Sequence, residues 1–245
     1  MKELILSDIT VMGPGYCVIG LERVAQGSSR SVRPLPRTGA AWPKTFPYGR
    51  GSVTRFVPAP TSASPPHLED QNTHGLAPAG KEVSEVELVD LLQSAEVSAN
   101  LEGLFRCELH TDTQAGNAWV DPSAATRSIC GCHFRNVRFR VFGDPGDLNL
   151  RARLVLQSGE TLNSLPVVDR DWRRFFDDLV QCRPKSRTPP ELEVFLNRAI
   201  RAELLRARCL FARIGLARGR PNEGKCWLML DSLFPQPNAA LLDNA

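Results

Sequence analysis

Long apolar runs are missing from the sequence. No stretch approaches the roughly 18 consecutive apolar residues that a membrane-spanning helix needs, and residues 1–10 lack the basic start and apolar segment of a signal peptide. Apolar residues make up 42% of the chain and charged residues 23%, the balance of a folded globular protein. We therefore expect a cytoplasmic protein without a membrane partner.

A disulfide framework and a convincing metal site are also missing. The seven cysteines form an odd and scattered set, which favours reduced thiols. Cys130, Cys132 and His133 stand together, and Cys107 or His110 could complete four ligands, but no second pair occurs at the spacing typical of zinc sites. Buried packing is the favoured interpretation of these cysteines over zinc, and we predict neither a metal nor a cofactor.

Sequence motifs of enzymes are scarce. The chain contains no nucleophile elbow, Walker loop, His-Glu-x-x-His or paired-carboxylate motif. Carboxylates at Asp169, Asp171, Asp177 and Asp178 fall one or two helical turns apart, but neighbouring arginines indicate surface ion pairs, and Asp169 is also placed to cap a helix. Catalysis is therefore the weaker class, with a metal-dependent nucleic-acid enzyme as the third hypothesis.

Charge is distributed very unevenly along the chain. Residues 65–122 carry 2 basic and 11 acidic groups, whereas residues 123–220 carry 19 basic and 10 acidic groups. Such asymmetry is typical of a protein with an electropositive face that attracts a polyanion or an acidic partner. Mutual packing of the acidic and basic segments is the alternative.

The first half of the chain has short strand patterns and one helix. Apolar runs at 4–11 and 16–21 flank a Gly-Pro-Gly turn and predict a hairpin, and a third strand is expected at 30–35. Residues from about 36 to 80 are rich in Pro, Gly, Ser and Thr and predict a long surface loop, with a short strand within 49–57. Ser84 and Glu87 fit a capping box that begins a helix over about 84–97.

The second half has the clearest strand of the chain. Within 127–142, apolar residues alternate with Arg138 and Arg140, and a turn at 144–147 leads into an alternating strand at 150–156. Together they predict a hairpin with an arginine-bearing face. Helices are expected near 170–180 and 190–206, followed by a closing hairpin at 209–216 and 226–233. We therefore predict a mainly β protein with a few helices (α+β) and a boundary between residues 125 and 126.

Three segments together resemble the bacterial family of dual OB-containing domain proteins. The run Tyr-Cys-Val-Ile-Gly at 16–20 with Arg-Ser-Val-Arg-Pro at 30–34 is similar to the family's opening strand pair, except that Ser31 replaces a usual aromatic residue. Leu-Pro-Val-Val-Asp at 165–169, before Trp172, resembles the family's start of a helix, with Val168 in place of threonine. Residues 214–218 and 226–228 resemble its last two strands.

The resemblance implies two tandem OB-like small β-barrels, over 1–125 and 126–245, and a nucleic-acid-binding role. Barrels of this type hold single strands with a basic groove and stacking aromatic residues. Phe134 and Phe139 lie beside the arginines of the clearest strand, although alternation also fits buried phenylalanines and merely solvated arginines. The family pattern points to the arginine at position 33, which a structural salt bridge would equally explain. The predicted nucleic-acid-binding residues are Arg33, Arg135, Arg138, Arg140, Arg151 and Arg153.

The first functional hypothesis is a module without catalysis that binds single-stranded DNA or RNA and serves a larger machinery. The alternative is a protein-interaction subunit of an assembly, which contacts its partner through the helix at 84–97 and the loop segment 59–80.

Overall fold

The computed structural model describes residues 1–24, 28–37, 41–61, 63–114, 116–144, 147–182, 188–218 and 224–238. Three predicted turns, at 26–28, 144–147 and 219–224, fall partly outside the described residues. The residues not described are 26–27, 145–146 and 219–223, respectively. Within the described residues, no helix has the length and apolar character required to cross a membrane.

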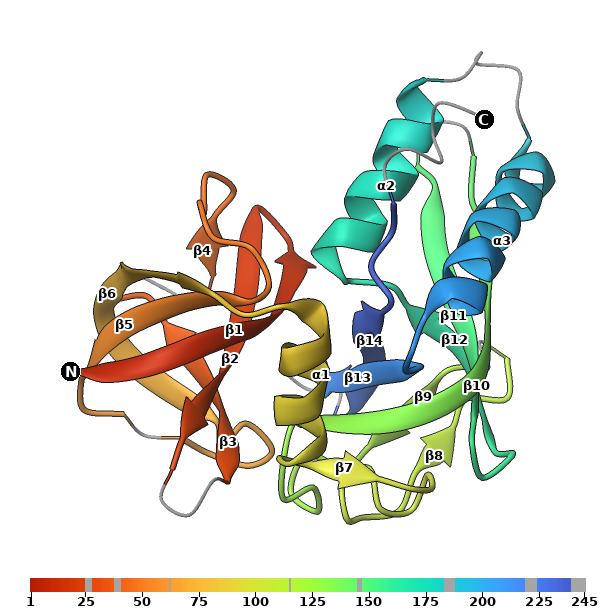
Figure 1. The fold of residues 1–245 in the computed structure, drawn as a ribbon. Coiled ribbons are helices and arrows are strands. Elements are labelled where there is room, and N and C mark those ends of the chain that lie inside the picture. Colours follow the sequence, from red (N-terminus) through yellow and green to blue (C-terminus); the bar gives the residue numbers. More distant parts are fainter. Residues whose placement is uncertain are drawn as a thin grey trace.

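The first half of the chain folds into a closed barrel (Figure 1). The hydrogen-bonded ring runs β1-β5-β6-β3-β2, and β2 returns to pair with β1. Its interior holds aliphatic and aromatic side chains, among them Leu4, Val18 and Phe56. The strands are β1 (Lys2–Met12), β2 (Gly15–Arg23), β3 (Ser29–Leu35), β5 (Ser52–Pro58) and β6 (Asp70–Glu82), with the short β4 (Trp42–Pro43) attached to β2.

The prediction of a long loop over residues 36–80 was wrong in one respect, because this segment contains most of a long strand, β6. It also contains β5, which overlaps the short strand expected at 49–57. β5 and β6 pair with each other and close the barrel. β6 has little apolar alternation because most of its side chains are partly or fully exposed. It is held through its main chain, antiparallel to β5 and parallel to β3 over Asp70–Asn72. Apolar periodicity carries no signal for such a strand.

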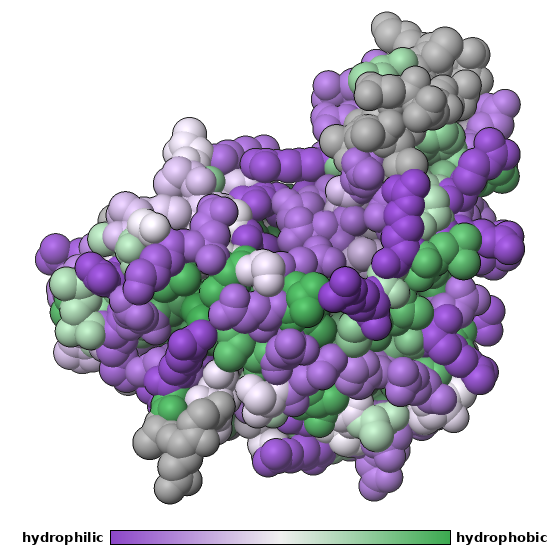
Figure 2. Space-filling view, viewed as in Figure 1, coloured by the Kyte–Doolittle hydropathy of each residue, from purple (hydrophilic) through white to green (hydrophobic). Residues whose placement is uncertain are grey.

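Helix α1 (Glu85–Gln93) connects the barrel to the rest of the chain. As predicted, Ser84 is its N-cap and accepts a hydrogen bond from the Glu87 amide. Its buried residues Leu88, Val89 and Leu92 pack in one cluster with residues of both halves, including Ile5 and Phe211. Figure 2 shows apolar side chains gathered over α1 and the adjoining edge of the barrel, within a mostly polar face.

The second half forms a curled sheet with the order β12-β11-β10-β13-β14-β9-β8, and β7 pairs separately with β10. The predicted hairpins are confirmed as β10–β11 and β13–β14, both antiparallel. The strands are β7 (Val97–Ser98), β8 (His110–Thr111), β9 (Ala118–Val120), β10 (Ile129–Phe142), β11 (Asn149–Leu156), β12 (Thr161–Pro166), β13 (Phe211–Leu216) and β14 (Cys226–Phe234).

The predicted boundary between residues 125 and 126 does not follow the strand pairing. β7 and β9 lie before it in the chain, yet they pair with β10 and β14 of the second sheet. The barrel is already complete at Glu82, where β6 ends. Short strands of two or three residues supply too few alternating positions to reveal their partner from sequence.

Two helices cover the second sheet (Figure 1). α2 (Arg170–Gln181) begins at Asp169, as predicted, and buries Trp172 against Phe139 of β10. α3 (Pro189–Arg206) lies along β10, where the Asn197 side chain bonds both the N–H and the C=O of Phe139. Mainly β architecture with a few helices is thus confirmed, and the closed barrel with a curled half-barrel sheet is consistent with two OB-like barrels.

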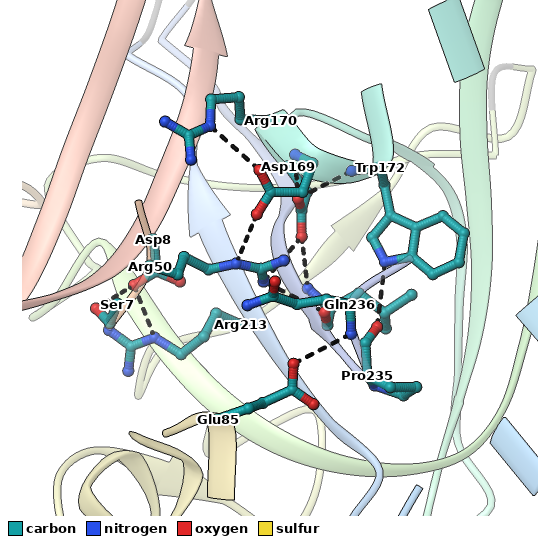
Figure 3. A network of polar contacts seen from close by, with 12 residues as sticks. Ser7, Asp8, Arg50, Glu85, Asp169, Arg170, Trp172, Arg213, Pro235 and Gln236 are labelled. Atoms are coloured by element: carbon teal, nitrogen blue, oxygen red, sulfur yellow. Dashed lines mark hydrogen bonds and ion pairs between the residues drawn. The ribbon is translucent and has the colours of Figure 1, made fainter. Parts of the chain in front are cut away.

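Buried charges join the two halves (Figure 3). Arg50 of the first half places its guanidinium 3.3 Å from Asp169 and 3.0 Å from Asp171, and it donates to the carbonyl of Leu233. Arg213 of β13 lies 3.4 Å from Asp8 of β1, and both side chains are fully buried. The expectation that the 169–178 carboxylates form surface ion pairs is wrong for Asp169, which is buried beside Arg50. Asp171 is partly exposed and pairs with its neighbour Arg170 at 3.2 Å as well as with Arg50.

Candidate nucleic-acid interface

The β10–β11 ladder brings four of the six predicted arginines together. Its register sets Arg138 directly opposite Arg153 and Arg140 directly opposite Arg151. The side chains at 137, 139 and 141 alternate with them and are buried, which leaves the arginine side of the hairpin facing outward. Three of the four arginines are exposed and Arg151 is half-buried. We call this surface the arginine face.

Little negative charge compensates the arginine face. Like charges directly opposite on neighbouring strands destabilise a sheet. Glu193 of α3 approaches Arg138 at 3.5 Å, and Arg151 donates to the carbonyl of Ser164, while no such partner of Arg140 or Arg153 is found among the described residues. Partial burial lowers the pKa of the Arg151 guanidinium below its usual value. Two opposed arginine pairs with one carboxylate beside them form a surface suited to an anion.

Arg135 stands at one end of the same ladder. The register shifts between Phe134 and Asn136, so Arg135 occupies a β-bulge. The residue is exposed, and its guanidinium lies toward the turn at Gly159, where an added Cβ would be 3.7 Å from Nη2. Arg135 is therefore an exposed arginine at the end of the ladder, outside the two opposed arginine pairs.

The aromatic residue of the arginine face is Phe142, which sequence reasoning missed. Phe134 and Phe139, the predicted neighbours of the arginines, are 1% and 0% exposed and belong to the core. Phe142 is 46% exposed and continues the alternation of Arg138 and Arg140 at the end of β10. The even-numbered spacing of 138, 140 and 142 was the signal that could have identified it.

Arg33 lies elsewhere, in the junction between the two halves. Only 4% of the residue is exposed. Its guanidinium bonds Asp70 at 2.9 Å, Nδ1 of His67 at 2.8 Å and the Ser128 hydroxyl at 2.8 Å. The salt bridge that the sequence left open is thus present, and Arg33 is not part of the arginine face.

The cysteine cluster lies in the second sheet. Cys130 and Cys132 are buried on β10, and burial raises the pKa of the Cys130 thiol to about 11 and that of Cys132 further. Such thiols stay protonated at neutral pH, which disfavours metal ligation. His133 contacts the Phe211 ring edge-on. Across the part of the chain that the structure describes, no group of three or more His, Cys, Asp or Glu residues is arranged to hold a metal ion.

Comparison of the chain with protein-family models, with curated proteins and with solved structures finds no match.

Proposed function

We propose that the protein binds single-stranded nucleic acid through the arginine face, without catalysis of its own. The observation that carries the proposal is the pairing of Arg138 with Arg153 and of Arg140 with Arg151 on an exposed face. Arginine side chains at this spacing can track the phosphates of a strand, while the exposed Phe142 ring offers a surface for base stacking. The sequence resemblance to the dual OB-containing domain proteins also predicts a nucleic-acid-binding role.

Binding to fluorescent single-stranded DNA and RNA oligonucleotides, measured by anisotropy over a range of salt concentrations, tests the proposal. We expect the affinity to fall with salt, and R138Q/R153Q to reduce the slope of log K against log salt by about 0.7 for each phosphate that the variant no longer neutralises. F142A should cost about 1–3 kcal/mol if its ring stacks on a base.

The matched control is R23Q/R55Q, which removes two exposed arginines of the first barrel and changes the net charge equally. Equal decreases in affinity for both double variants would mean that overall charge drives binding. No binding at low salt would overturn the proposal.

The alternative of a protein-interaction subunit, contacting its partner through 84–97 and 59–80, gains less support. The apolar side of α1 is already covered by the two halves of this chain, since Leu88, Val89 and Leu92 are buried. The exposed residues of the first turn of α1 are Glu85 and Glu87 together with the half-exposed Val86. Purification of the full chain with and without residues 59–80, followed by identification of bound proteins, would test this alternative.

A further inference from the structure

Helix α3 presents two exposed arginines that lie outside the arginine face. Arg198 and Arg201 are exposed, and within the described part of the chain neither has a hydrogen-bond or ion-pair partner. Side chains three residues apart lie on the same side of a helix, so both guanidinium groups project from one stripe of α3. Val194 and Leu205, which are 61% and 81% exposed, continue this stripe at its two ends. We call these four residues the helix stripe.

Polar side chains attach α3 to the edge of β10 opposite β11 (Figure 1). Asn197 accepts from the Phe139 N–H at 2.8 Å and donates to the Phe139 carbonyl at 2.9 Å, as a neighbouring strand would. One helical turn earlier, Glu193 accepts from the Val141 N–H at 3.4 Å. Four helical residues rise about 6 Å and two strand residues about 6.7 Å, so α3 runs antiparallel to β10 and keeps in step with it.

The helix stripe lies on the same side of the sheet as the arginine face. Successive side chains turn about 100° around a helix, so the order around α3 runs from Leu192 through Glu193 to Val194. Leu192 is buried in the core, whereas Glu193 reaches Arg138 of the arginine face at 3.5 Å. The helix stripe is one step further round, away from the core. In the register of α3 with β10, Arg201 comes level with the strand beside Arg138.

The carboxylates of α3 are engaged elsewhere and leave the helix stripe positively charged. Glu191, in the first turn, accepts from the N–H and the hydroxyl of the N-cap Thr188. Glu193 is engaged by β10, through one arginine and one main-chain N–H. Glu203 is buried and lies 3.6 Å from Arg206. The stripe therefore adds two arginines to the anion-binding surface and no carboxylate that pairs with them.

We propose that a single strand bound at the arginine face continues onto α3, where Arg198 and Arg201 neutralise two further phosphates. The ligand is the same, so this extension rests on the proposed function. Neighbouring strands lie about 4.8 Å apart and a helix with its side chains is about 10–12 Å across, so the rows of arginines on β11, β10 and α3 span roughly 15 Å. At about 3.4 Å for each stacked nucleotide, that span requires about five nucleotides. The ligand is therefore an oligonucleotide rather than a mononucleotide.

The test is the salt dependence of binding to a single strand of about 12 nucleotides, within the roughly 4–16 nucleotides that one OB fold covers. We expect R198Q/R201Q to reduce the slope of log K against log salt by about 1.4, which is about 0.7 for each phosphate, and the quadruple variant with R138Q/R153Q to reduce it by about 2.8. Glutamine has nearly the helix propensity of arginine, so α3 should remain intact, which circular dichroism checks.

The matched control is again R23Q/R55Q, which removes the same charge from the first barrel and should leave the slope nearly unchanged. An equal reduction in R23Q/R55Q and R198Q/R201Q would mean that overall charge acts, and would overturn the extension onto α3.

A second variant acts in the opposite direction. E193Q removes the carboxylate between the helix stripe and the arginine face, while its amide oxygen still accepts from the Val141 N–H, so it should bind the strand more tightly than wild type. E87Q, at an exposed position of α1, changes the net charge equally and should bind like wild type. Equal gains for the two variants would contradict the proposal.

The outcomes separate this extension from the proposed function. If R138Q/R153Q reduces the slope and R198Q/R201Q does not, the strand binds at the arginine face and the extension onto α3 is overturned. If wild type does not bind the strand at low salt, the proposed function is overturned together with the extension.

Discussion

The pKa of the buried Asp231 carboxyl is set by the groups around it. Burial is the largest cause of its raised pKa and the nearby Asp8 the second, while Arg33 and Arg213 oppose them. The carboxyl lies directly over Gly215, where an added Cβ would be 2.1 Å from Oδ2. Glycine at 215 thus makes room for an acid that burial keeps protonated.

Replacement of Asp231 by asparagine should change how stability depends on pH. An unfolded aspartate titrates near pH 3.9, while the folded pKa of Asp231 is raised to about 8. Between these values the folded state binds more protons at this site, so the contribution of Asp231 to stability falls as pH rises and levels off above about pH 8. D231N lacks this slope and should gain on wild type by up to about 1.4 kcal/mol per pH unit.

Urea denaturation at several pH values between about 5 and 9 measures the effect. D144N, at an exposed position, should keep the wild-type slope. Parallel curves for wild type and D231N would contradict the prediction.

Strands differ in how much of their structure can be predicted from sequence. β10 and β11 were predictable because alternate side chains face the core and solvent, and the same parity placed four arginines on one face. β6 was not, since main-chain bonds rather than buried side chains hold it. The position of Arg33 was equally hidden, because its bond to Ser128 joins residues 95 positions apart.

Removal of one arginine from the ladder should stabilise the isolated protein while it weakens binding. R153T relieves the repulsion with Arg138 and places a β-branched residue on the strand, so we expect a gain of about 0.2–1 kcal/mol in the free energy of unfolding. Chemical denaturation without nucleic acid measures it. A gain combined with weaker oligonucleotide binding would indicate that the arginine pair is maintained for a ligand.

R55T is the matched control, because Arg55 is an exposed strand residue that pairs with Glu3. Its free energy of unfolding should fall by at most about 1 kcal/mol. Lower stability of R153T than of wild type would show that the pair is not under strain.

The molecule as a whole is joined by polar contacts as much as by apolar ones. Arg50 and Asp169 form one buried pair, which the partly exposed Asp171 joins, and Arg213 with Asp8 forms another. α1 adds apolar packing that includes residues of both halves. Each half therefore supplies the oppositely charged partner of a buried charge in the other half.

R50M should destabilise the protein strongly, because it leaves Asp169 as a buried carboxylate without its counter-ion. Removal of one partner of a buried pair costs about 3–5 kcal/mol, and both side chains are only 2% exposed. R55M, at an exposed ion pair, should cost less than about 1 kcal/mol. Equilibrium urea denaturation compares the two. Similar small decreases in stability would show that the Arg50 ion pairs contribute little to cohesion.

The polar junction also limits how the gene could be divided. A cut after Glu82, where the barrel is complete, would yield one polypeptide with Arg50 and Asp8 exposed and another with Asp169 and Arg213 exposed. The same cut would expose Ile5, Leu21 and Val53, which pack against α1 and Phe211, so each fragment would present apolar side chains beside its unpaired charges. Neither half should then behave as a transferable unit that can be moved intact into another protein.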